Sequence, residues 1–349
     1  MSEAKPTGRC IIDAPYENNV TVLVTGGAGF VGLNLVEALL EREREVVLFD
    51  AGALPRGADR ALEPHAKRLH VERGSVLEPG ALDALFRRYR IRHVIHAAAV
   101  TSGPQRETRD PAGIVEVNLR GTVNVLTAAR EHGVQRTVYI GSGAAYGESL
   151  YRYPRLYEHT LSVPATLYSI TKHAAERMCM RLRALWEIDI VCVRLGTVIG
   201  PWERDTGVRD NFGTHSQLAA MAIAGKSAVL MTREIQRDWI YARDVAEGVI
   251  ALLDAAAPKH LMYNLSSGVA WEQPIARWCE ALKAAYPAFS YREALATEDA
   301  NIWYTDRDRG IMDIGRLEHD IAFRVRYPMR EAYTHYLAWL ARSREFFAA

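Results

Sequence analysis

The sequence has few cysteines, no excess of either charge and no long apolar run. Its 349 residues include 43 Lys plus Arg and 42 Asp plus Glu, which gives a formal net charge of +1. This balance offers no basic surface for a run of phosphates, so it argues against nucleic acid as a partner. The four cysteines lie far apart and form no C-x-x-C pair. We therefore expect reduced thiols in a cytoplasmic protein rather than a disulfide-stapled secreted fold.

The sequence also shows no membrane-spanning, targeting or metal-binding segment. The longest apolar runs, such as residues 46–49 and 91–100, stop well short of the roughly 20 residues that span a bilayer. Residues 1–19 carry charges of both signs without a continuous apolar core, so we interpret them as a polar arm and not as a signal peptide. The histidines lack metal-ligand spacing and no H-E-x-x-H segment occurs. Neither a membrane nor a metal is expected as a partner.

What the sequence does contain is an alternation of short apolar runs and helical stretches. Helices such as residues 34–44 are expected between strands at residues 20–24, 45–50, 68–72, 93–97, 137–140 and 188–194. This alternation predicts an α/β fold, a doubly wound parallel sheet with crossover helices on both faces. At roughly 150 residues per domain, the length leaves room for a second domain.

After residue 200 the rhythm changes to a mixture of short elements. Strands are expected at residues 228–231, 237–241 and 261–265, and helices at 217–224, from 244, at 272–285 and at 329–342. We expect residues 20–200 to form the first domain and residues 201–349 mainly a smaller mixed α/β lobe, with about 236–258 returning to the first domain. Trp271, Trp278 and the aromatic residues of 333–339 are interpreted as packing. The lobe should cover the carboxyl ends of the first sheet's strands, where ligands of such sheets bind, and so carry substrate contacts.

A glycine-rich segment follows the first strand. Residues 25–32, T-G-G-A-G-F-V-G, contain G-x-x-G-x-x-G from Gly26 and G-x-G-x-x-G from Gly27, and a helix follows at once. Without side chains the backbone can approach a pyrophosphate, which the N–H groups and dipole of the helix N-terminus stabilise. The segment predicts a Rossmann-type dinucleotide site.

Asp50, which ends the second strand, indicates which dinucleotide binds. It lies about 20 residues after the glycines, the spacing at which a carboxylate accepts hydrogen bonds from an adenosine ribose. A 2'-phosphate would meet a like charge there, so NAD is favoured over NADP. Arg56 keeps NADP open, because a nearby arginine can accept a 2'-phosphate.

Tyr168 and Lys172 form a Y-x-x-x-K pair in a helical stretch. At this i, i+4 spacing the two side chains lie on one helix face and can share a pocket. A neighbouring ammonium and a positive nicotinamide ring would both stabilise a phenolate and lower the pKa of Tyr168 from about 10. Tyr168 is therefore a candidate general acid and base.

Further motifs occur in the order of a known family. They are H-A-A-A at 96–99, V-N-L-R-G-T at 117–122, S-G-A-A-Y-G at 142–147, R-L-G-T-V-I-G-P at 194–201, R-D-W-I-Y at 237–241 with D-V-A at 244–246, and Y-N-L-S-S-G at 263–268. From about residue 20 to 340 the chain resembles the extended short-chain dehydrogenases/reductases, in particular the NAD-dependent epimerase/dehydratase family typified by UDP-galactose 4-epimerase.

The resemblance implies an NAD-dependent enzyme with a Ser–Tyr–Lys set. Ser142 would bond the substrate oxygen, Tyr168 would move the proton, and Lys172 would orient the nicotinamide ribose, while hydride leaves the same carbon. The cofactor contacts expected are Gly26, Gly29, Phe30, Val31, Gly32, Asp50, Ser75, Val76, Ala97, Ala98, Ala99, Asn118, Tyr168, Lys172, Leu195 and Thr197.

The segment after Ser142 separates the chemistries of this family. The 4,6-dehydratases carry an Asp-Glu pair there and the sugar-acid decarboxylases a Glu, whereas this sequence has Gly143 and Ala144. Redox epimerisation at one sugar carbon, or simple oxidation and reduction, therefore remains. By resemblance we also expect a homodimer, formed through a helix bundle to which residues 166–185 contribute.

The substrate remains open between a nucleotide sugar and a free sugar, sugar acid or polyol. Thr197 replaces a common Asn, Ser75 replaces an Asp, and Arg309–Asp313 only partly matches an Arg-Pro-Gly-Asp segment. The candidate substrate contacts are Thr101, Ser102, Ala144, Arg237 and Arg309. A third reading is a non-catalytic NAD-binding protein, which has no need of a tuned tyrosine.

Three arginines have two interpretations each. Arg106 and Arg109 lie on a polar loop after the fourth strand and either grip a carboxylate or phosphate or are solvated. Arg237 either binds an anionic substrate or pairs with a neighbouring Asp.

Overall fold

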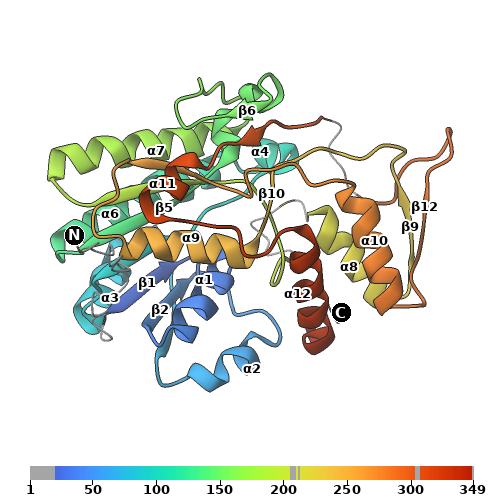
Figure 1. Ribbon diagram of the computed structural model, residues 1–349. Helices are drawn as coiled ribbons and strands as arrows, with labels where there is room; N and C mark the ends of the chain where they lie inside the picture. The colour runs from blue at the N-terminus through green and yellow to red at the C-terminus, as the bar shows by residue number, and fades with distance from the viewer. Residues whose placement is uncertain (1–19, 205–209, 211–212, 303–306, 348–349) are drawn as a thin grey trace, which may run out of the picture.

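A seven-stranded parallel sheet forms the centre of the molecule (Figure 1). The computed structural model describes residues 20–204, 210, 213–302 and 307–347, so the polar arm at 1–19 lies outside the described residues. The strands run in the order β11-β7-β5-β4-β1-β2-β3. Their bounds are β1 Thr21–Thr25, β2 Glu45–Asp50, β3 Leu69–Arg73, β4 His93–His96, β5 Arg136–Ser142, β7 Ile190–Leu195 and β11 Met262–Leu265. The expected doubly wound α/β fold is confirmed.

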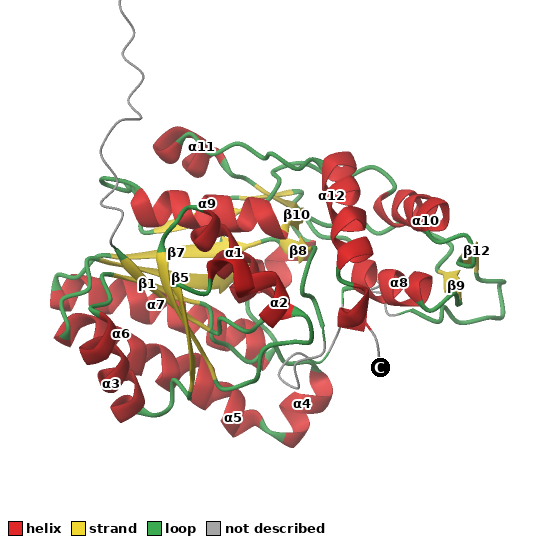
Figure 2. Ribbon diagram, turned by 90° about the horizontal axis from the view of Figure 1, so that it is seen from below, coloured by secondary structure: helices red, strands yellow, loops and turns green. Residues whose placement is uncertain are grey.

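Both faces of the sheet are covered by helices (Figure 2). On β1, Val22 and Val24 point to one core and Leu23 to the other, and all three are fully buried. Helices α1 (Phe30–Glu41) and α9 (Ala242–Asp254) pack on the first face, and α3 (Pro79–Tyr89), α6 (Thr122–Glu131) and α7 (Leu167–Trp186) on the second. Because central strands such as β1 and β7 are buried on both faces, they read as continuous apolar runs rather than alternating ones, whereas the edge strand β3 is partly exposed.

Two details differ from the sequence-based expectation. Helix α1 begins at Phe30, directly after Gly29, and not at residue 34. The strand expected at 261–265 is β11, which pairs with β7 at the edge of the main sheet. Helix α9 and β11 thus both belong to the sheet side of the molecule. We propose that the dinucleotide-binding unit comprises residues 20–200 together with about 239–265.

The second lobe lies beside the sheet and is built from short elements (Figures 1 and 2). Within it β9 pairs with β12, and at its border with the dinucleotide-binding unit β6 pairs with β13 and β8 with β10, each pair being parallel. Their bounds are β6 Arg155–Leu156, β8 Thr197–Ile199, β9 Ser227–Leu230, β10 Trp239–Tyr241, β12 Ser290–Glu293 and β13 Ile311–Met312. The lobe's helices are α8 Thr214–Ile223, α10 Pro274–Ala285 and α12 Met329–Arg342.

Shorter helices connect these elements. They are α2 Ala58–Leu62, α4 Pro104–Arg109, α5 Pro111–Val115, α11 Gly315–Ile321, the 3₁₀ turns Glu63–His65, Gly143–Tyr146, Glu148–Tyr151 and Arg344–Phe347, and the π-helical turn Glu116–Gly121.

An aromatic cluster holds the second lobe together. Trp278 stacks on Tyr336 with ring centroids 5.2 Å apart, and Trp202 meets Trp339 edge to face at 5.0 Å. Trp278 and Tyr336 are fully buried. The packing role expected for Trp271, Trp278 and the aromatic residues of 333–339 is confirmed, since all of them are buried.

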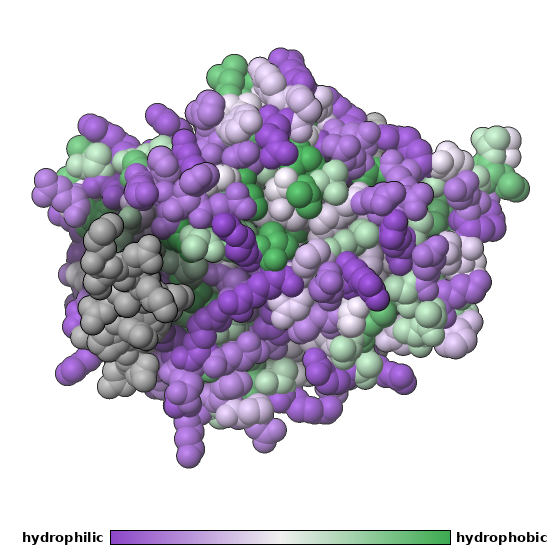
Figure 3. All heavy atoms as spheres, in the orientation of Figure 1, coloured by the Kyte–Doolittle hydropathy of each residue, from purple (hydrophilic) through white to green (hydrophobic). Residues whose placement is uncertain are grey.

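The visible surface is mostly hydrophilic, with apolar side chains scattered over it (Figure 3). Within the described ranges, no helix is long and apolar enough to cross a bilayer. The strand order reverses between β1 and β4. At such a reversal the loops leaving the two strands diverge, and they open a crevice at the carboxyl ends where ligands bind.

Candidate active site

A cavity of about 1030 Å³ lies at the carboxyl ends of β1, β2, β4 and β5. Arg237 and Arg309 of the second lobe line the same cavity. All but one of the residues expected as cofactor contacts, the five candidate substrate contacts and the Ser–Tyr–Lys set line this cavity; Asn118 does not, and neither do Arg56, Arg106 and Arg109.

The glycine-rich turn leaves no room for side chains. Gly26 has φ +70°, and a Cβ there would lie 2.6 Å from the Ala98 backbone nitrogen. A Cβ on Gly32 would lie 2.1 Å from the Gly26 carbonyl oxygen. No side chain caps the N-terminus of α1, whose N-cap residue is Gly29. The backbone N–H groups can therefore meet a pyrophosphate, and the turn fits a dinucleotide.

We predict that Gly32→Ala weakens NAD binding by at least about tenfold, because the turn must shift to admit the methyl group. Calorimetric titration with NAD measures the affinity, and thermal unfolding tests whether the fold survives. Gly80→Ala is the matched control, since a Cβ on this α3 residue meets nothing within 4 Å. NAD affinity of Gly32→Ala equal to that of the control would contradict the tight-turn explanation.

Asp50 is fixed beside this turn. Its Oδ2 accepts a hydrogen bond from the Ala28 N–H at 3.0 Å and its Oδ1 one from the Gly52 N–H at 2.8 Å. A carboxylate has about four acceptor positions, so two remain for ribose hydroxyls. The residue therefore fits the adenosine end of NAD.

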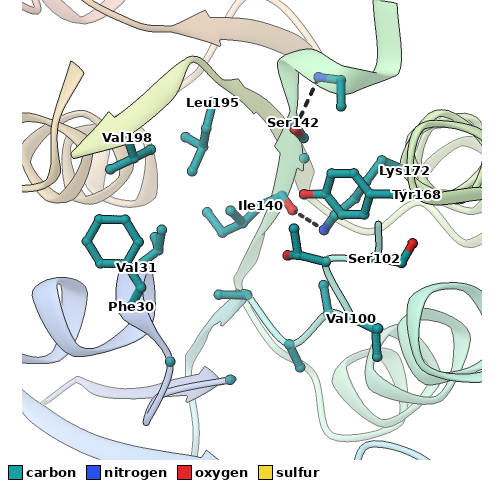
Figure 4. A pocket seen from close by; sticks show the side chains of 18 of the residues that line it. Phe30, Val31, Val100, Ser102, Ile140, Ser142, Tyr168, Lys172, Leu195 and Val198 are labelled. Carbon is teal, nitrogen blue, oxygen red and sulfur yellow. Dashed lines mark hydrogen bonds between the residues drawn. The ribbon is translucent and has the colours of Figure 1, made fainter. Parts of the chain in front are cut away.

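Ser142 ends β5 and faces the cavity (Figure 4). Its Oγ accepts a hydrogen bond from the Ala144 N–H at 3.1 Å. Because this bond uses a lone pair, the hydroxyl proton is free to be donated to a substrate oxygen.

Tyr168 and Lys172 lie in the first turns of α7. Thr166 caps this helix in a reciprocal pair with Ser169, which fixes where the helix begins. Figure 4 shows the Tyr168 hydroxyl pointing into the pocket on the same side as Ser142, with Phe30 and Val31 across from it. The Y-x-x-x-K spacing thus brings both side chains to the cavity, as the sequence predicted.

Lys172 is almost fully buried, at 4% exposure. Its Nζ donates to the Ile140 carbonyl oxygen at 2.9 Å (Figure 4). Burial lowers the pKa of Lys172, and the charges of Tyr168 and Glu176 act in the opposite direction. With one of three donors used, the ammonium can still bind a ribose hydroxyl.

Asn118, which the sequence suggested as a cofactor contact, is not among the residues that line the cavity. Its amide oxygen accepts from the Val100 N–H at 2.8 Å, and its Nδ2 donates to the Val100 carbonyl oxygen and to Thr171 Oγ1 at 3.0 Å. These bonds occupy both ends of the amide. Asn118 therefore fastens Val100, which lines the cavity, to the helix that carries Tyr168.

Arg237 and Arg309 bring positive charge to the cavity wall. Arg237 is 7% exposed, its Nη2 has no hydrogen-bond partner, and it forms no ion pair with a carboxylate of the described residues. Burial lowers its pKa to about 9, with a further contribution from Arg309. The ion pair with an Asp that the sequence left open is not formed, and an anion bound between the two guanidiniums would be stabilised.

The arginines of the loop after β4 have other roles. Arg106 Nε donates to Asp210 Oδ1 at 2.7 Å, and the Gly103 N–H donates to the other oxygen of Asp210. Arg109 is exposed, and neither arginine lines the cavity. In the structure, the Arg106 side chain is thus paired with Asp210, and Arg109 lies away from the cavity.

Asp238 lines the cavity without having been singled out from the sequence. It is 4% exposed, and its Oδ2 accepts from the Met312 N–H at 2.7 Å while its Oδ1 has no partner. Burial raises its pKa to about 7. Asp238 thus anchors the segment that follows Arg309. Its place in the R-D-W-I-Y motif was the available signal.

We predict that Asp238→Asn makes the protein relatively more stable as pH rises. The unfolded chain releases this proton near pH 4 and the folded protein near pH 7, so the wild type loses stability between these values. The amide keeps an acceptor for Met312 and cannot ionise. Denaturant unfolding at pH 5 and pH 8 gives the free energy of unfolding of the variant minus that of the wild type. This difference should be more positive at pH 8 than at pH 5, by on the order of 3 kcal/mol. An equal difference at both pH values would contradict the prediction.

The fold and the cavity define a protein that binds a dinucleotide beside a Ser–Tyr–Lys set. Residues 22–266 match the model of the NAD dependent epimerase/dehydratase family. The chain belongs to this family, and NAD is its cofactor. The turn at Gly26–Gly32, Asp50 and Lys172 supply what NAD requires.

Known relatives agree with this assignment. The chain is 32% identical over 247 residues to UDP-glucuronate 4-epimerase 4 of Arabidopsis thaliana (68% of this chain, 55% of the relative) and 29% identical over 276 residues to human UDP-glucose 4-epimerase (72% and 78%). It spans about half the length of the plant relatives. The UDP-glucose 4-epimerase of Thermus thermophilus, solved with NAD, superposes with a TM-score of 0.72 at 25% identity, covering 93% of this chain and 100% of that one.

Proposed function

We propose that the protein is a nucleotide-sugar epimerase that inverts one sugar carbon without dehydration. The observation that carries the proposal is the arginine pair Arg237, which is buried, and Arg309, which is half-buried, in the same cavity as Ser142, Tyr168 and Lys172. Two guanidiniums that have no carboxylate partner among the described residues suit a diphosphate, which carries two charges and several acceptor oxygens. The names of the relatives, which are UDP-sugar 4-epimerases, support the same substrate class.

The residues divide the chemistry between them. NAD, when bound, supplies the hydride acceptor and donor. Ser142 donates a hydrogen bond to the reacting oxygen, and Tyr168 takes the proton from it and later returns it. Lys172 holds the ribose side and places a positive charge near Tyr168. Inversion requires that the keto sugar turns over in the cavity between the two proton transfers.

The wall next to Ser142 supports the absence of dehydration. Gly143 and Ala144 carry no acid or base, and a Cβ on Gly143 would lie 3.0 Å from the Met312 sulfur. Among the described residues, the carboxylates that line the cavity are Asp50 and Asp238. Asp50 lies by the glycine turn and Asp238 is bonded to the Met312 N–H. Elimination of water therefore lacks a carboxylic acid beside Ser142.

The test is to incubate the NAD-loaded protein with UDP-, GDP- and dTDP-sugars and with free aldoses, uronates and aldonates. Isomer exchange of a nucleotide sugar without net NADH at 340 nm is the expected result. Oxidation of a free sugar acid with stoichiometric NADH would overturn it in favour of a dehydrogenase, since the same arginine pair can bind a carboxylate. Tight NAD binding without turnover of any of these compounds would favour the non-catalytic reading.

We also propose a homodimer formed through the outer face of α7. Ile170 and Leu185 on this helix are 43% and 54% exposed, and Val115 of the neighbouring α5 is 40% exposed. Leu185→Glu should convert the dimer to a 39.0 kDa monomer in light scattering after gel filtration. Leu295→Glu, at a leucine of the second lobe that is 69% exposed, is the control that should stay dimeric. A monomeric wild type would end this proposal.

The cellular location is proposed as cytoplasmic. Cys179, Cys192 and Cys279 are buried free thiols, which suits a reducing compartment.

A further inference from the structure

Arg204 crosses from the second half of the chain to the glycine turn. Its Nη1 donates to the Ala28 carbonyl oxygen at 3.1 Å and its Nη2 to the Ala53 carbonyl oxygen at 3.4 Å. Ala28 belongs to the β1–α1 turn and Ala53 follows β2. Arg204, Ala28 and Ala53 all line the cavity. The guanidinium therefore bridges the two backbone segments that flank the adenosine side of the site.

The charge of Arg204 is not neutralised by an ion pair with a described residue. Both of its acceptors are carbonyl oxygens. Asp50 is the carboxylate that acts on it electrostatically, and both oxygens of Asp50 already accept backbone N–H groups. Partial burial lowers the pKa of Arg204. A phosphate in the cavity would therefore gain a charge-assisted hydrogen bond from this side chain.

The backbone that carries Arg204 is held firmly. Asn34 Nδ2 of α1 donates to the Pro201 carbonyl oxygen at 2.9 Å. Trp202 is 1% exposed and meets Trp339 and Phe346 edge to face. The buried Glu203 accepts from the Gly213 N–H at 3.0 Å. Because three preceding residues are fixed, little freedom is lost when the guanidinium binds a phosphate.

We propose that Arg204 binds the pyrophosphate of the dinucleotide together with the N-terminus of α1 and slows its release. An epimerase needs its NAD to stay bound until the hydride is returned, and in that respect the inference extends the proposed function. Cofactor release is measured without a sugar, so the result does not depend on which sugar the enzyme accepts.

The experiment follows NAD leaving the purified, NAD-loaded protein after dilution into an NAD trap. Arg204→Ala should release NAD about ten- to a hundredfold faster than the wild type. Arg204→Lys keeps the positive charge but loses the two-pronged guanidinium, so its rate of NAD release should lie between those of the wild type and Arg204→Ala. Arg60→Ala is the matched control, because Arg60 is 72% exposed, pairs with Glu345 and does not line the cavity. An unchanged release rate in Arg204→Ala would overturn the proposal.

The phosphate that Arg204 recognises is identified by comparing ligands. If it is the pyrophosphate, Arg204→Ala weakens binding of NAD and ADP and leaves adenosine unaffected. If the loss is confined to NADP, Arg204 reads the 2'-phosphate, and the pyrophosphate assignment is wrong. Circular dichroism and thermal unfolding of each variant separate lost binding from lost folding, and Arg204→Gln serves if the alanine variant does not fold.

Discussion

Tyr168→Phe should lower kcat by about 10²- to 10⁴-fold while NAD still binds. The change removes one oxygen atom, and with it the proton that has to move at the sugar hydroxyl. The glycine turn, Asp50 and Lys172 remain in place, so the cofactor site stays intact. Steady-state isomer exchange measures the loss, and calorimetric titration measures NAD affinity.

The control for this prediction is Tyr153→Phe. Tyr153 is 45% exposed and lies outside the cavity, so its hydroxyl should be dispensable. The charge interaction with Tyr168 acts to raise the pKa of Lys172, and a phenylalanine at this position cannot supply it, so the small residual activity should depend on pH differently from the wild type. A Tyr168→Phe enzyme with more than half of the normal kcat would remove Tyr168 from the proton-transfer role.

Contiguous motifs were the part of the site that sequence could predict. Gly26 and Gly32 are required by local backbone approach, and Tyr168 and Lys172 meet because of helical spacing. Each of these relations is set by a few neighbouring residues. The local sequence pattern was therefore sufficient to predict both the cofactor-binding turn and the helix with Tyr168 and Lys172.

Asn118 shows where the local pattern was insufficient. It lies in the π-helical turn Glu116–Gly121, and its amide is bonded to Val100 and Thr171, which are far from it in sequence. A family motif places such a residue near the cofactor but does not show which neighbouring groups form hydrogen bonds with its amide. The bonding partners depend on how α7 and the loop after β4 pack together.

The surroundings of strand β11 and of Arg237 also could not be predicted from the local sequence pattern. A short apolar run such as Met262–Leu265 has the same local pattern whichever sheet it joins. Arg237 could be read either as a partner of an Asp or as an anion-binding residue, because the choice depends on which side chains surround it. Its burial beside Arg309 is a property of the folded lobe.

Arg237→Ala and Arg309→Ala should each raise the dissociation constant for a UDP-sugar by about 10- to 100-fold, with a smaller change in kcat. A charge-assisted hydrogen bond lost from a desolvated site accounts for a loss of this size. Because both guanidiniums would contact one diphosphate, the double variant should lose less than the product of the two effects. Titration with UDP, a UDP-sugar and the free sugar measures each loss.

Arg233→Ala is the matched control for these variants, since Arg233 is 47% exposed, pairs with Asp308 and does not line the cavity. Unchanged UDP affinity in both single variants, with weakened binding of a free sugar acid, would assign the arginines to a carboxylate instead.

In Arg237→Ala, the stability of the protein without substrate should rise while its affinity for the UDP-sugar falls. Burial and the neighbouring Arg309 lower the pKa of Arg237 to about 9, which means that its charge is unfavourable in the folded protein at neutral pH. Arg237→Ala should therefore raise the melting temperature of the protein without substrate, provided that the cavity left by the side chain is filled by water. Weaker substrate binding together with a higher melting temperature would indicate that the charge of Arg237 serves ligand binding. If the charge stabilised the fold, Arg237→Ala would lose both affinity and stability.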